Sequence, residues 1–281
     1  MTHRLYYTDP MLRTFDATVV ACDARDGRFH VVLDRTAFYP TSGGQPFDTG
    51  RLGAAQIGDV VDRADGEIAH VASAPLAIGG RISGEIDWPR RVDHMQQHTG
   101  QHMLSAAFDR LFGVRTVSFH LGQDGSTIDL AREVTPAEIG DAEALASRVV
   151  WEDRDVTVRF ATAEDAARLP LRKEPVRSGE LRLVDVSDFD LSACGGTHVP
   201  RTGMVGVVAV SGWERFKGGS RVSFVCGRRA LRNHGRLRDL AAASARLLSA
   251  AEADVPAGLE RLQEELRTAS KAAMYSGRQA G

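Results

Sequence analysis

The first part of the chain carries short runs in which hydrophobic and polar residues roughly alternate. Glycine and aspartate separate these runs, which include TFDATVVAC, GRFHVVLDR, IGDVVDRA, GEIAHVAS and GRISGEIDW. Alternation with a period of two is typical of half-buried strands, and short strands at close spacing favour a small barrel or sandwich. The pattern therefore predicts a small β-barrel-like domain over residues 1–86.

A helical pattern replaces the alternation at residue 87. Asp87 and Pro89 have the properties of a helix start, and Gly113 those of a helix end. The sequence then predicts a hairpin over 114–132, a helix that is capped by Thr135, and further strands as far as residue 228. We expect residues 87–228 to form an α+β domain with a mixed or antiparallel sheet.

Residues 229–281 are rich in alanine, leucine and charged side chains at helical spacing. They predict C-terminal helices that form an arm beyond the α+β domain. Such helices suit a homodimer, and they also suit a stub that leads to a further domain of a longer protein. The predicted fold class of the whole chain is α+β.

The composition is that of an ordinary globular protein. The 281 residues are 43% hydrophobic and 26% charged, with a formal net charge of -2. This charge provides no global basic field, so nucleic-acid binding needs a local patch. The cysteines Cys22, Cys194 and Cys226 form no evident disulfide framework, which favours a reducing cytoplasm. No apolar run approaches the ~18 residues of a membrane span.

Three histidines follow one another at intervals of four on the predicted helix: His94, His98 and His102. Residues four apart share a helix face, so two such imidazoles can bind one metal ion at about 2.0–2.1 Å. His94 and His102 are separated by about 12 Å along a helix axis, too far for one ion to hold both. The residues alone leave open the pairs 94/98 and 98/102, as well as solvated or core histidines.

A cysteine and a histidine form the second half of the pattern, in Cys194-Gly-Gly-Thr-His198. The glycines allow a tight turn, and Pro200 prevents a helix from continuing through it. A thiolate and an imidazole presented by one loop suit a metal, and a mixture of nitrogen and sulfur donors favours zinc. The alternative is a buried thiol beside an unrelated histidine. Together the two halves predict a zinc site that joins distant segments.

Four features of the sequence resemble one known family. They are HTGQH with the later CGGTH, FYPTSGGQPFDTG, SFHLGQDGSTIDL and ERFKGGSRVSFVCGRRAL. These resemble the metal signature, the glycine-rich motif, the hairpin and the basic segment of the alanyl-tRNA synthetase editing domain and its freestanding relatives, the AlaX proteins. The resemblance covers about residues 35–235. It departs at Ser42, where the family often has glycine, and at Lys217-Gly-Gly-Ser-Arg221, which lacks one basic position of the family's KGxRRI run.

The resemblance implies roles for particular residues. It implies that one Zn2+ ion is held by His98, His102, Cys194 and His198, and it leaves His94 outside the site. It implies contacts with the acceptor end of tRNA(Ala) at Gly43, Gly44, Gln45, Lys217 and Arg221. Arginines at positions 228, 229, 232, 236 and 238 add local basicity that suits phosphates, with a solvated helix face as the alternative.

The resemblance also implies an activity. It indicates a long-form AlaX-type enzyme that hydrolyses mischarged Ser-tRNA(Ala) in trans, with Gly-tRNA(Ala) as a further candidate substrate; the segment before residue 35 is too short for an ATP site. Zinc lowers the pKa of bound water toward about 7 or polarises a carbonyl. A catalytic zinc usually keeps an open position, whereas four protein ligands usually mark a structural site. Either one ligand therefore yields to water or substrate, or the zinc mainly orients the aminoacyl end; we favour a water-bearing site in which His198 is the weakest ligand.

Selection for serine needs hydrogen-bond partners for its hydroxyl, because a site built to bind a hydroxyl rejects an analogue that lacks it. Gln101, Ser118 and Thr197 are the partners that we expect. Asp188 and Asp190 are candidates for orienting a ligand histidine, although exposed loop carboxylates are the interpretation that the sequence favours.

Two other classes of protein share part of this pattern. A zinc hydrolase of small esters or amides would have the same ligands, but it would not require the glycine-rich motif or the basic segment. A non-catalytic tRNA-binding module with a structural zinc would bind tRNA without turnover.

Overall fold

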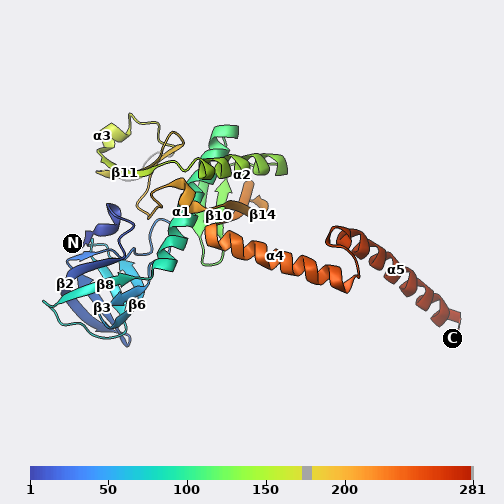
Figure 1. The fold of residues 1–281 in the computed structure, drawn as a ribbon, viewed down its shortest axis with the longest axis horizontal. Coiled ribbons are helices and arrows are strands. Elements are labelled where there is room, and N and C mark those ends of the chain that lie inside the picture. Colours follow the sequence, from blue (N-terminus) through green and yellow to red (C-terminus); the bar gives the residue numbers. More distant parts are fainter. Residues whose placement is uncertain (173–178, 280–281) are drawn as a thin grey trace. The chain divides into compact units, whose positions relative to one another are not determined.

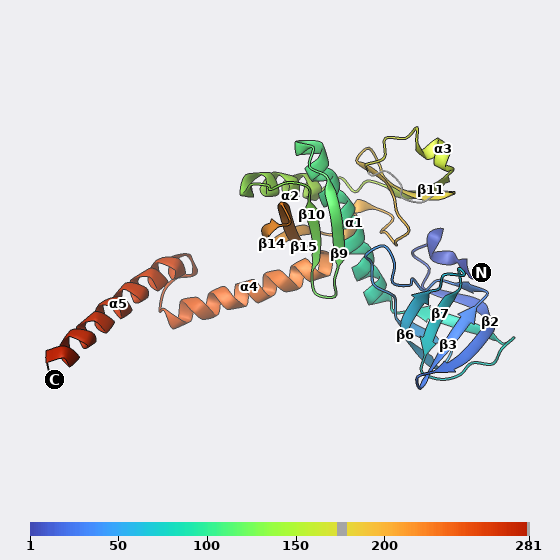
Figure 2. The same cartoon turned by 180° about the vertical axis from the view of Figure 1, so that it is seen from behind.

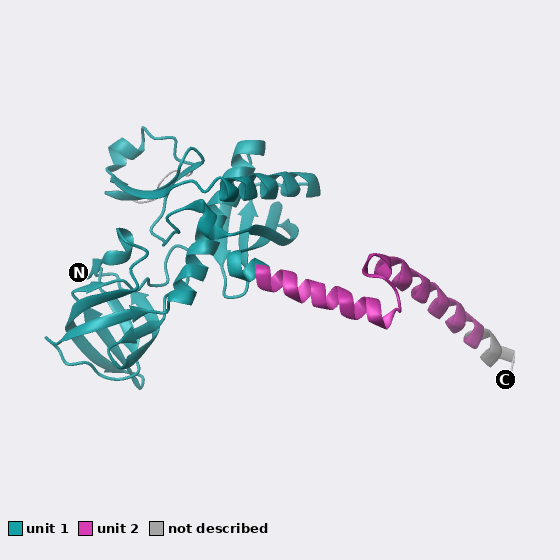
Figure 3. Ribbon diagram, in the orientation of Figure 1, with its two compact units in different colours: residues 1–230 teal, residues 231–281 magenta. Residues whose placement is uncertain are grey.

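The computed structural model describes residues 1–172 and 179–279 and has the predicted α+β class. The chain divides into two compact units, Met1–Ala230 and Leu231–Gly281 (Figure 3). The barrel and the α+β block, which we predicted as separate domains, both lie in the first unit. Within the described ranges, no helix combines the length and apolar character needed to cross a membrane.

Six antiparallel strands close into a barrel at the N-terminal end of the chain (Figure 1). In barrel order they are β2 (Thr14–Arg25), β3 (Arg28–Leu33), β7 (Ile68–Ala72), β6 (Ala55–Asp62), β5 (Gly50–Leu52) and β8 (Arg81–Ile86). A short parallel pair, β1 (His3–Arg4) with β4 (Arg35–Thr36), accompanies the barrel, and η1 (Leu5–Tyr7) follows β1. Alternate side chains point inward, so Val31, Leu33 and Val60 share one apolar core.

Helix α1 (Trp88–Phe112) follows the last barrel strand and packs against helix α2 (Pro136–Trp151) (Figure 1). The predicted ends of α1 are confirmed: the Asp87 side chain accepts a hydrogen bond from the N–H of Arg90, and Gly113 ends the helix in the left-handed conformation. The middle of α1 is buried on nearly every side, and Gly100 leaves no room for a methyl group beside Sγ of Cys226. Neighbouring elements therefore surround α1.

A four-stranded antiparallel sheet packs against α1 and α2 (Figure 2). In sheet order its strands are β14 (Val208–Phe216), β15 (Gly219–Cys226), β10 (Ser126–Leu130) and β9 (Thr116–Leu121). β9 and β10 form the predicted hairpin, and α2 begins with the predicted capping box of Thr135 and Glu138. The apolar faces of the sheet and of both helices build the second core.

A three-stranded sheet carries the cysteine loop. Its order is β11 (Val156–Ala161), β12 (Leu181–Val186) and β13 (Asp190–Ala193), and α3 (Ala163–Ala166) follows β11. Cys194 comes directly after β13, so the antiparallel pairing of β12 with β13 fixes the start of the loop. The loop leads into η2 (Thr202–Val205) and then into β14.

The predicted helices near the C-terminus are α4 (Gly227–Leu247) and α5 (Val255–Gln279), with η3 (Glu252–Asp254) between them. The second unit begins within α4. Several leucines of these helices are exposed, among them Leu240, Leu259, Leu262 and Leu266.

A buried ion pair joins the barrel segment to α1. The side chains of Arg91 and Asp48 are both fully buried, and their charged atoms are 2.5 Å apart. Arg91 also donates to the carbonyl oxygen of Pro10 at 2.7 Å, and Asp48 accepts a hydrogen bond from the N–H of Tyr39 at 2.7 Å. Because Asp48 belongs to the glycine-rich segment, this pair holds that segment against the helix.

Removing the cation of this pair is predicted to destabilise the first unit. Arg91→Ala leaves the Asp48 carboxylate buried without its partner, which costs about 3–5 kcal/mol of unfolding free energy. Urea unfolding followed by circular dichroism measures the change. As a control, Arg168→Ala removes an exposed pair with Glu164 and should cost no more than about 0.5 kcal/mol. Equal losses in the two variants would show that the buried pair is not an anchor.

Candidate metal centre

The structure brings together His98 and His102 from α1 with Cys194 and His198 from the loop after β13. One ligand atom of each residue lies within 4.8 Å of the others. Sγ of Cys194 is 3.4 Å from Nε2 of His98 and 3.3 Å from Nε2 of His198. Nitrogen and sulfur ligands at tetrahedral positions around zinc are roughly 3.5 Å apart. The donor set and its spacing therefore fit one tetrahedral metal ion.

His94 lies outside this group. Its side chain is buried, and burial together with the charge of Arg90 lowers its pKa to about 4. It is therefore a neutral histidine in the interior. Of the two histidine pairs that spacing left open, the fold gathers 98/102 with the cysteine loop.

Each histidine of the group turns Nδ1 toward a protein partner. Nδ1 of His98 is 2.8 Å from Oε1 of Gln45, and Nδ1 of His102 is 2.9 Å from Oδ2 of Asp190. Nδ1 of His198 is 3.2 Å from Oγ1 of Thr99. Partners of this kind fix the orientation and tautomer of a ligand histidine, so the other ring nitrogen is directed to the metal.

Asp190 is one of these partners. The sequence favoured an exposed loop carboxylate at this position, and that interpretation was wrong. Asp190 is 5% exposed, and besides His102 it pairs with Arg172, whose Nε is 2.6 Å from Oδ1. Burial alone raises the pKa of Asp190, but the hydrogen bond from His102 and the charge of Arg172 outweigh it and leave the pKa well below its usual range. Asp188 is exposed, which agrees with the interpretation that the sequence favoured.

The charges of the group suit a cation. Burial raises the pKa of the Cys194 thiol, but the charges of His98 and His198 outweigh burial and hold that pKa well below its usual range. Burial lowers the pKa of His102, yet hydrogen bonds with Asp190 and Cys194 raise it to about 9. Burial and the charge of His98 lower the pKa of His198 to about 3. A metal therefore meets a thiolate, and on binding it displaces the proton of His102.

Close packing fixes the cysteine loop beside α1. A Cβ atom at Gly196 would overlap the imidazole of His98, whereas one at Gly195 would meet only the Tyr7 hydroxyl, at 3.6 Å. Arg182 of β12 donates hydrogen bonds to the carbonyl oxygens of Cys194 at 2.7 Å and Gly196 at 2.9 Å. The loop therefore has little freedom to move away from the histidines.

Gln101 and Thr197 lie beside the ligands, and both are buried. Nε2 of Gln101 donates a hydrogen bond to Oγ of Ser105 at 2.8 Å. The same Ser105 oxygen accepts a hydrogen bond from the hydroxyl of Thr116, also at 2.8 Å. Oγ1 of Thr197 accepts from Nε2 of Gln45 at 2.8 Å. The sequence analysis did not identify Thr116 as a member of this polar group. Its local sequence pattern does not indicate that this strand residue faces α1.

Ser118 is not brought to the group. It is exposed on β9 and donates a hydrogen bond to Asp129 at 2.5 Å. The next residue, Phe119, faces the site instead, with its ring 5.7 Å from that of His98. Successive residues of a strand point to opposite faces. The sequence predicted the hairpin correctly but not which face of β9 lies toward the ligands.

The glycine-rich segment makes a two-residue turn. Gly43 and Gly44 have φ of 53° and 81°, and Ser42 pairs with Gln45 across them. Ser42 itself has no positive φ, so serine is accommodated where the family often has glycine. The space beside Gly43 is open, Gly44 lies against the Phe119 ring, and Gln45 is fully buried.

Lys217 and Arg221 lie at and near the β14–β15 turn. Lys217 lies at the tip of the turn, where it is exposed and has a left-handed conformation, and Gly218 follows it. The segment Lys217-Gly-Gly-Ser-Arg221, which departs from the family's KGxRRI run, therefore forms a tight hairpin turn. Arg221 pairs with Asp129 at 2.7 Å, and its guanidinium carbon is 3.6 Å from the centre of the Phe216 ring. Lys217 is thus the more available of the two for an RNA phosphate.

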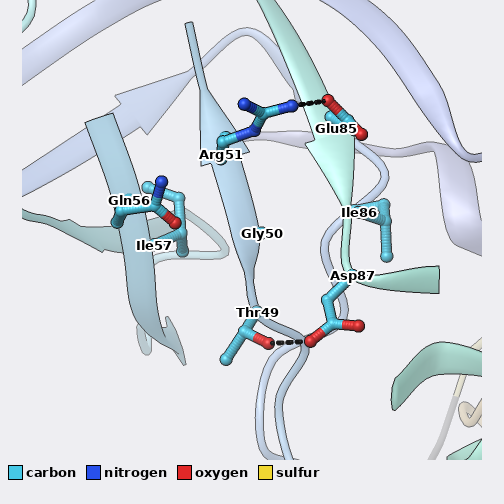
Figure 4. Close-up of a pocket in the computed structure, with 8 residues that line it drawn as sticks. All are labelled: Thr49, Gly50, Arg51, Gln56, Ile57, Glu85, Ile86 and Asp87. Atoms are coloured by element: carbon cyan, nitrogen blue, oxygen red, sulfur yellow. Dashed lines mark hydrogen bonds and ion pairs between the residues drawn. The ribbon is translucent and has the colours of Figure 1, made fainter. Parts of the chain in front are cut away.

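A hollow of about 280 Å3 lies elsewhere, on the barrel, between β5, β6 and β8 (Figure 4). Arg51 and Glu85 form an ion pair in it, and the Thr49 hydroxyl donates to Asp87 at 3.1 Å. None of the four clustered ligands lines this hollow. The hollow and the metal centre therefore have no residue in common.

Comparison with known proteins gives a consistent group of similar chains. Residues 181–223 match the family model described as "Threonyl and Alanyl tRNA synthetase second additional domain". The chain is 34% identical to the alanyl-tRNA editing protein AlaX-L of Pyrococcus horikoshii, over 95% of this chain and 68% of that protein. It is also 34% identical to AlaX-M of Methanosarcina acetivorans, over 73% of this chain and 90% of that protein.

Larger proteins are similar over only part of their length. The alanine--tRNA ligase of Pyrococcus abyssi is 34% identical over 96% of this chain, but the match spans 31% of the ligase. The shared segment includes the barrel and the clustered donors.

Substitution of Gly196 is predicted to disturb the metal centre. Gly196→Ala places a methyl group against the His98 ring, so zinc affinity should fall at least about tenfold, as when ligand support is lost. Competition with a chromophoric chelator measures this affinity. Gly195→Ala is the matched control and should bind zinc as the wild type does. Equal affinities in the two variants would contradict the geometry.

Zinc affinity is predicted to fall with falling pH. The pKa of His102 is raised to about 9, so below that value a metal must displace its proton. Displacement of one proton weakens apparent affinity about tenfold for each pH unit. Chelator competition over a pH series measures the slope, and Asp190→Asn should make it shallower because the charge that holds the proton is gone. A flat profile would contradict the assignment.

Proposed function

The chain belongs to the family of alanyl-tRNA editing proteins, and from that premise we propose that it hydrolyses mischarged Ser-tRNA(Ala), and Gly-tRNA(Ala), in trans. The observation that carries the proposal is the group of four donor atoms within 4.8 Å, enclosed by segments that match the editing proteins. One thiolate and three imidazoles suit Zn2+, which we propose as the metal. We further propose a cytoplasmic enzyme, because charged tRNA is used there.

The reaction is the hydrolysis of an ester at the 3′-terminal ribose. The oxygen of water bonds to the carbonyl carbon, the ester C–O bond breaks, and the ribose oxygen leaves and takes up a proton. When bound, Zn2+ supplies Lewis acidity to such a step. The protein's own contribution is to hold His98 and His102 in one orientation through Gln45 and Asp190, and to keep Cys194 as a thiolate.

Gln101 and Thr197 are the residues that we propose for recognition of the serine hydroxyl. Both lie next to ligands, and Oε1 of Gln101 has no hydrogen-bond partner among the described residues. The hydroxyl of Thr197 accepts from Gln45, so its own hydrogen remains available to a substrate. Ser118 is not proposed for this role because it is engaged with Asp129 on the other face of β9.

The partner that we propose is the acceptor end of tRNA(Ala). Gly43 and Lys217 are exposed, the former in the glycine-rich turn and the latter at a hairpin tip, and both suit contact with a sugar-phosphate backbone. Arg221 and the exposed arginines that open α4, such as Arg228 and Arg232, add positive charge.

A homodimer through the C-terminal helices remains part of the proposal. Leu259, Leu262 and Leu266 of α5 are 47%, 53% and 68% exposed. Their spacing of three and four residues is that of a helix seam that packs against another helix.

A non-catalytic tRNA-binding protein with a structural zinc is the second candidate. It is favoured by the number of donors, because four protein ligands usually close a zinc site. This candidate binds tRNA(Ala) in a salt-dependent manner and releases no amino acid. An assay of tRNA(Ala) deacylation therefore separates the two functions.

The test is deacylation of Ser-, Gly- and Ala-tRNA(Ala) by the zinc-loaded protein. We predict release of serine and glycine, little release of alanine, and a loss of at least about 100-fold in rate for Cys194→Ala, which removes the thiolate ligand. Cys22→Ala is the control, because Cys22 lies in the barrel strand β2. Binding without turnover by the wild type would reject the enzyme in favour of the structural-zinc protein.

A further inference from the structure

Gln45 occupies an unexpected position for a residue of the glycine-rich turn. Its side chain is fully buried and makes three hydrogen bonds within the metal centre. Oε1 lies 2.8 Å from Nδ1 of His98 and 3.0 Å from the backbone N of Thr197, and Nε2 lies 2.8 Å from Oγ1 of Thr197. One amide from the barrel segment therefore links a helix ligand to the cysteine loop.

The chemistry of these partners determines which ring nitrogen of His98 donates to Gln45. The backbone N–H of Thr197 can only donate, so the atom of Gln45 that faces it must be the amide oxygen. The same oxygen faces Nδ1 of His98, which must then carry the ring proton. Nε2 of His98, 3.4 Å from Sγ of Cys194, is then the ring nitrogen that a metal can bind. Gln45 thus selects the tautomer that can bind a metal.

Other contacts hold the turn in this place. The carbonyl oxygen of Gly44 accepts a hydrogen bond from the N–H of Leu121 at 3.1 Å, and a Cβ atom at Gly44 would overlap the Phe119 ring. The buried pair of Arg91 and Asp48 fixes the end of the same segment on α1. Contact of Gln45 with RNA would require these interactions to break.

We infer that Gln45 is a positioning residue of the metal centre, which holds His98 in its metal-binding tautomer and aligns the Thr197 loop, rather than a contact to tRNA. The barrel segment is on this account a component of the metal site. The inference for metal binding stands on the geometry alone, and its consequence for ester hydrolysis rests on the proposed function.

The test uses two substitutions and a control in the full chain. Gln45→Met keeps the length of the side chain but removes both hydrogen-bonding groups. Gln45→Glu keeps two acceptor oxygens for the His98 ring and the Thr197 N–H. Gln56→Met alters an exposed glutamine of the barrel strand β6 and is the control. Zinc affinity by chelator competition, tRNA(Ala) binding, and kcat and KM for deacylation are measured for each.

We expect Gln45→Met to weaken zinc binding about 10–100-fold, the range for loss of a hydrogen bond to a ligand histidine. Gln45→Glu should restore zinc affinity to within about tenfold of the wild type, and tRNA binding should be unchanged in all variants. For deacylation at saturating zinc, kcat should fall in Gln45→Met with KM unchanged. A tRNA contact predicts the opposite pattern: unaltered zinc affinity, and weaker tRNA binding that is worst for the anionic Gln45→Glu.

Unaltered zinc affinity in a folded Gln45→Met overturns the inference. If that variant does not fold, nitrogen-15 correlation spectra of the zinc-loaded wild type decide, because His98 must show a protonated Nδ1 and a metal-bound Nε2; the reverse assignment overturns the inference. A protein without deacylase activity in any form would reject the proposed function, while the zinc and spectroscopic results would still judge the role of Gln45.

Discussion

The buried ion pair of Arg91 and Asp48 sets the geometry on which the metal centre depends. Both side chains are fully buried, so neither charge can be solvated by water, and the pair holds the barrel segment in one place on α1. Gln45 lies three residues before Asp48 in that segment. The anchor therefore determines where the Gln45 amide meets His98, and with it how the barrel takes part in the centre.

Three separate parts of the chain complete the site. Two of them supply the ligands, and the third orients one ligand. Helix α1 contributes two imidazoles on one face, and the loop after β13 contributes a thiolate and a third imidazole. The barrel segment contributes no ligand, but its amide orients one. A metal ion bound here would connect elements that are distant in sequence, so metal binding contributes to the stability of the fold as well as to chemistry.

The sequence was informative where a local rule decides the structure. The capped ends of α1, the Thr135 capping box and the β9–β10 hairpin follow from residue types at fixed spacing. The four clustered donors were predicted by resemblance, because spacing alone left two histidine pairs open. Of the partners of the ligands, the sequence offered only Asp190 as a candidate, and an exposed carboxylate was the interpretation favoured for it. Gln45, Asp190 and Thr99 become partners only through burial and tertiary contact, and Ser118 was misplaced because a hairpin pattern does not identify the inward face.

The central claim is that one ion is held by one sulfur and three nitrogen atoms from His98, His102, Cys194 and His198. X-ray absorption at the zinc edge measures this ligand set directly in the zinc-loaded protein. The account predicts one sulfur near 2.3 Å and nitrogen scatterers with imidazole character at about 2.0–2.1 Å, and loss of the sulfur contribution in Cys194→Ala. Two or more sulfur ligands, or a wild-type spectrum without sulfur, would contradict it.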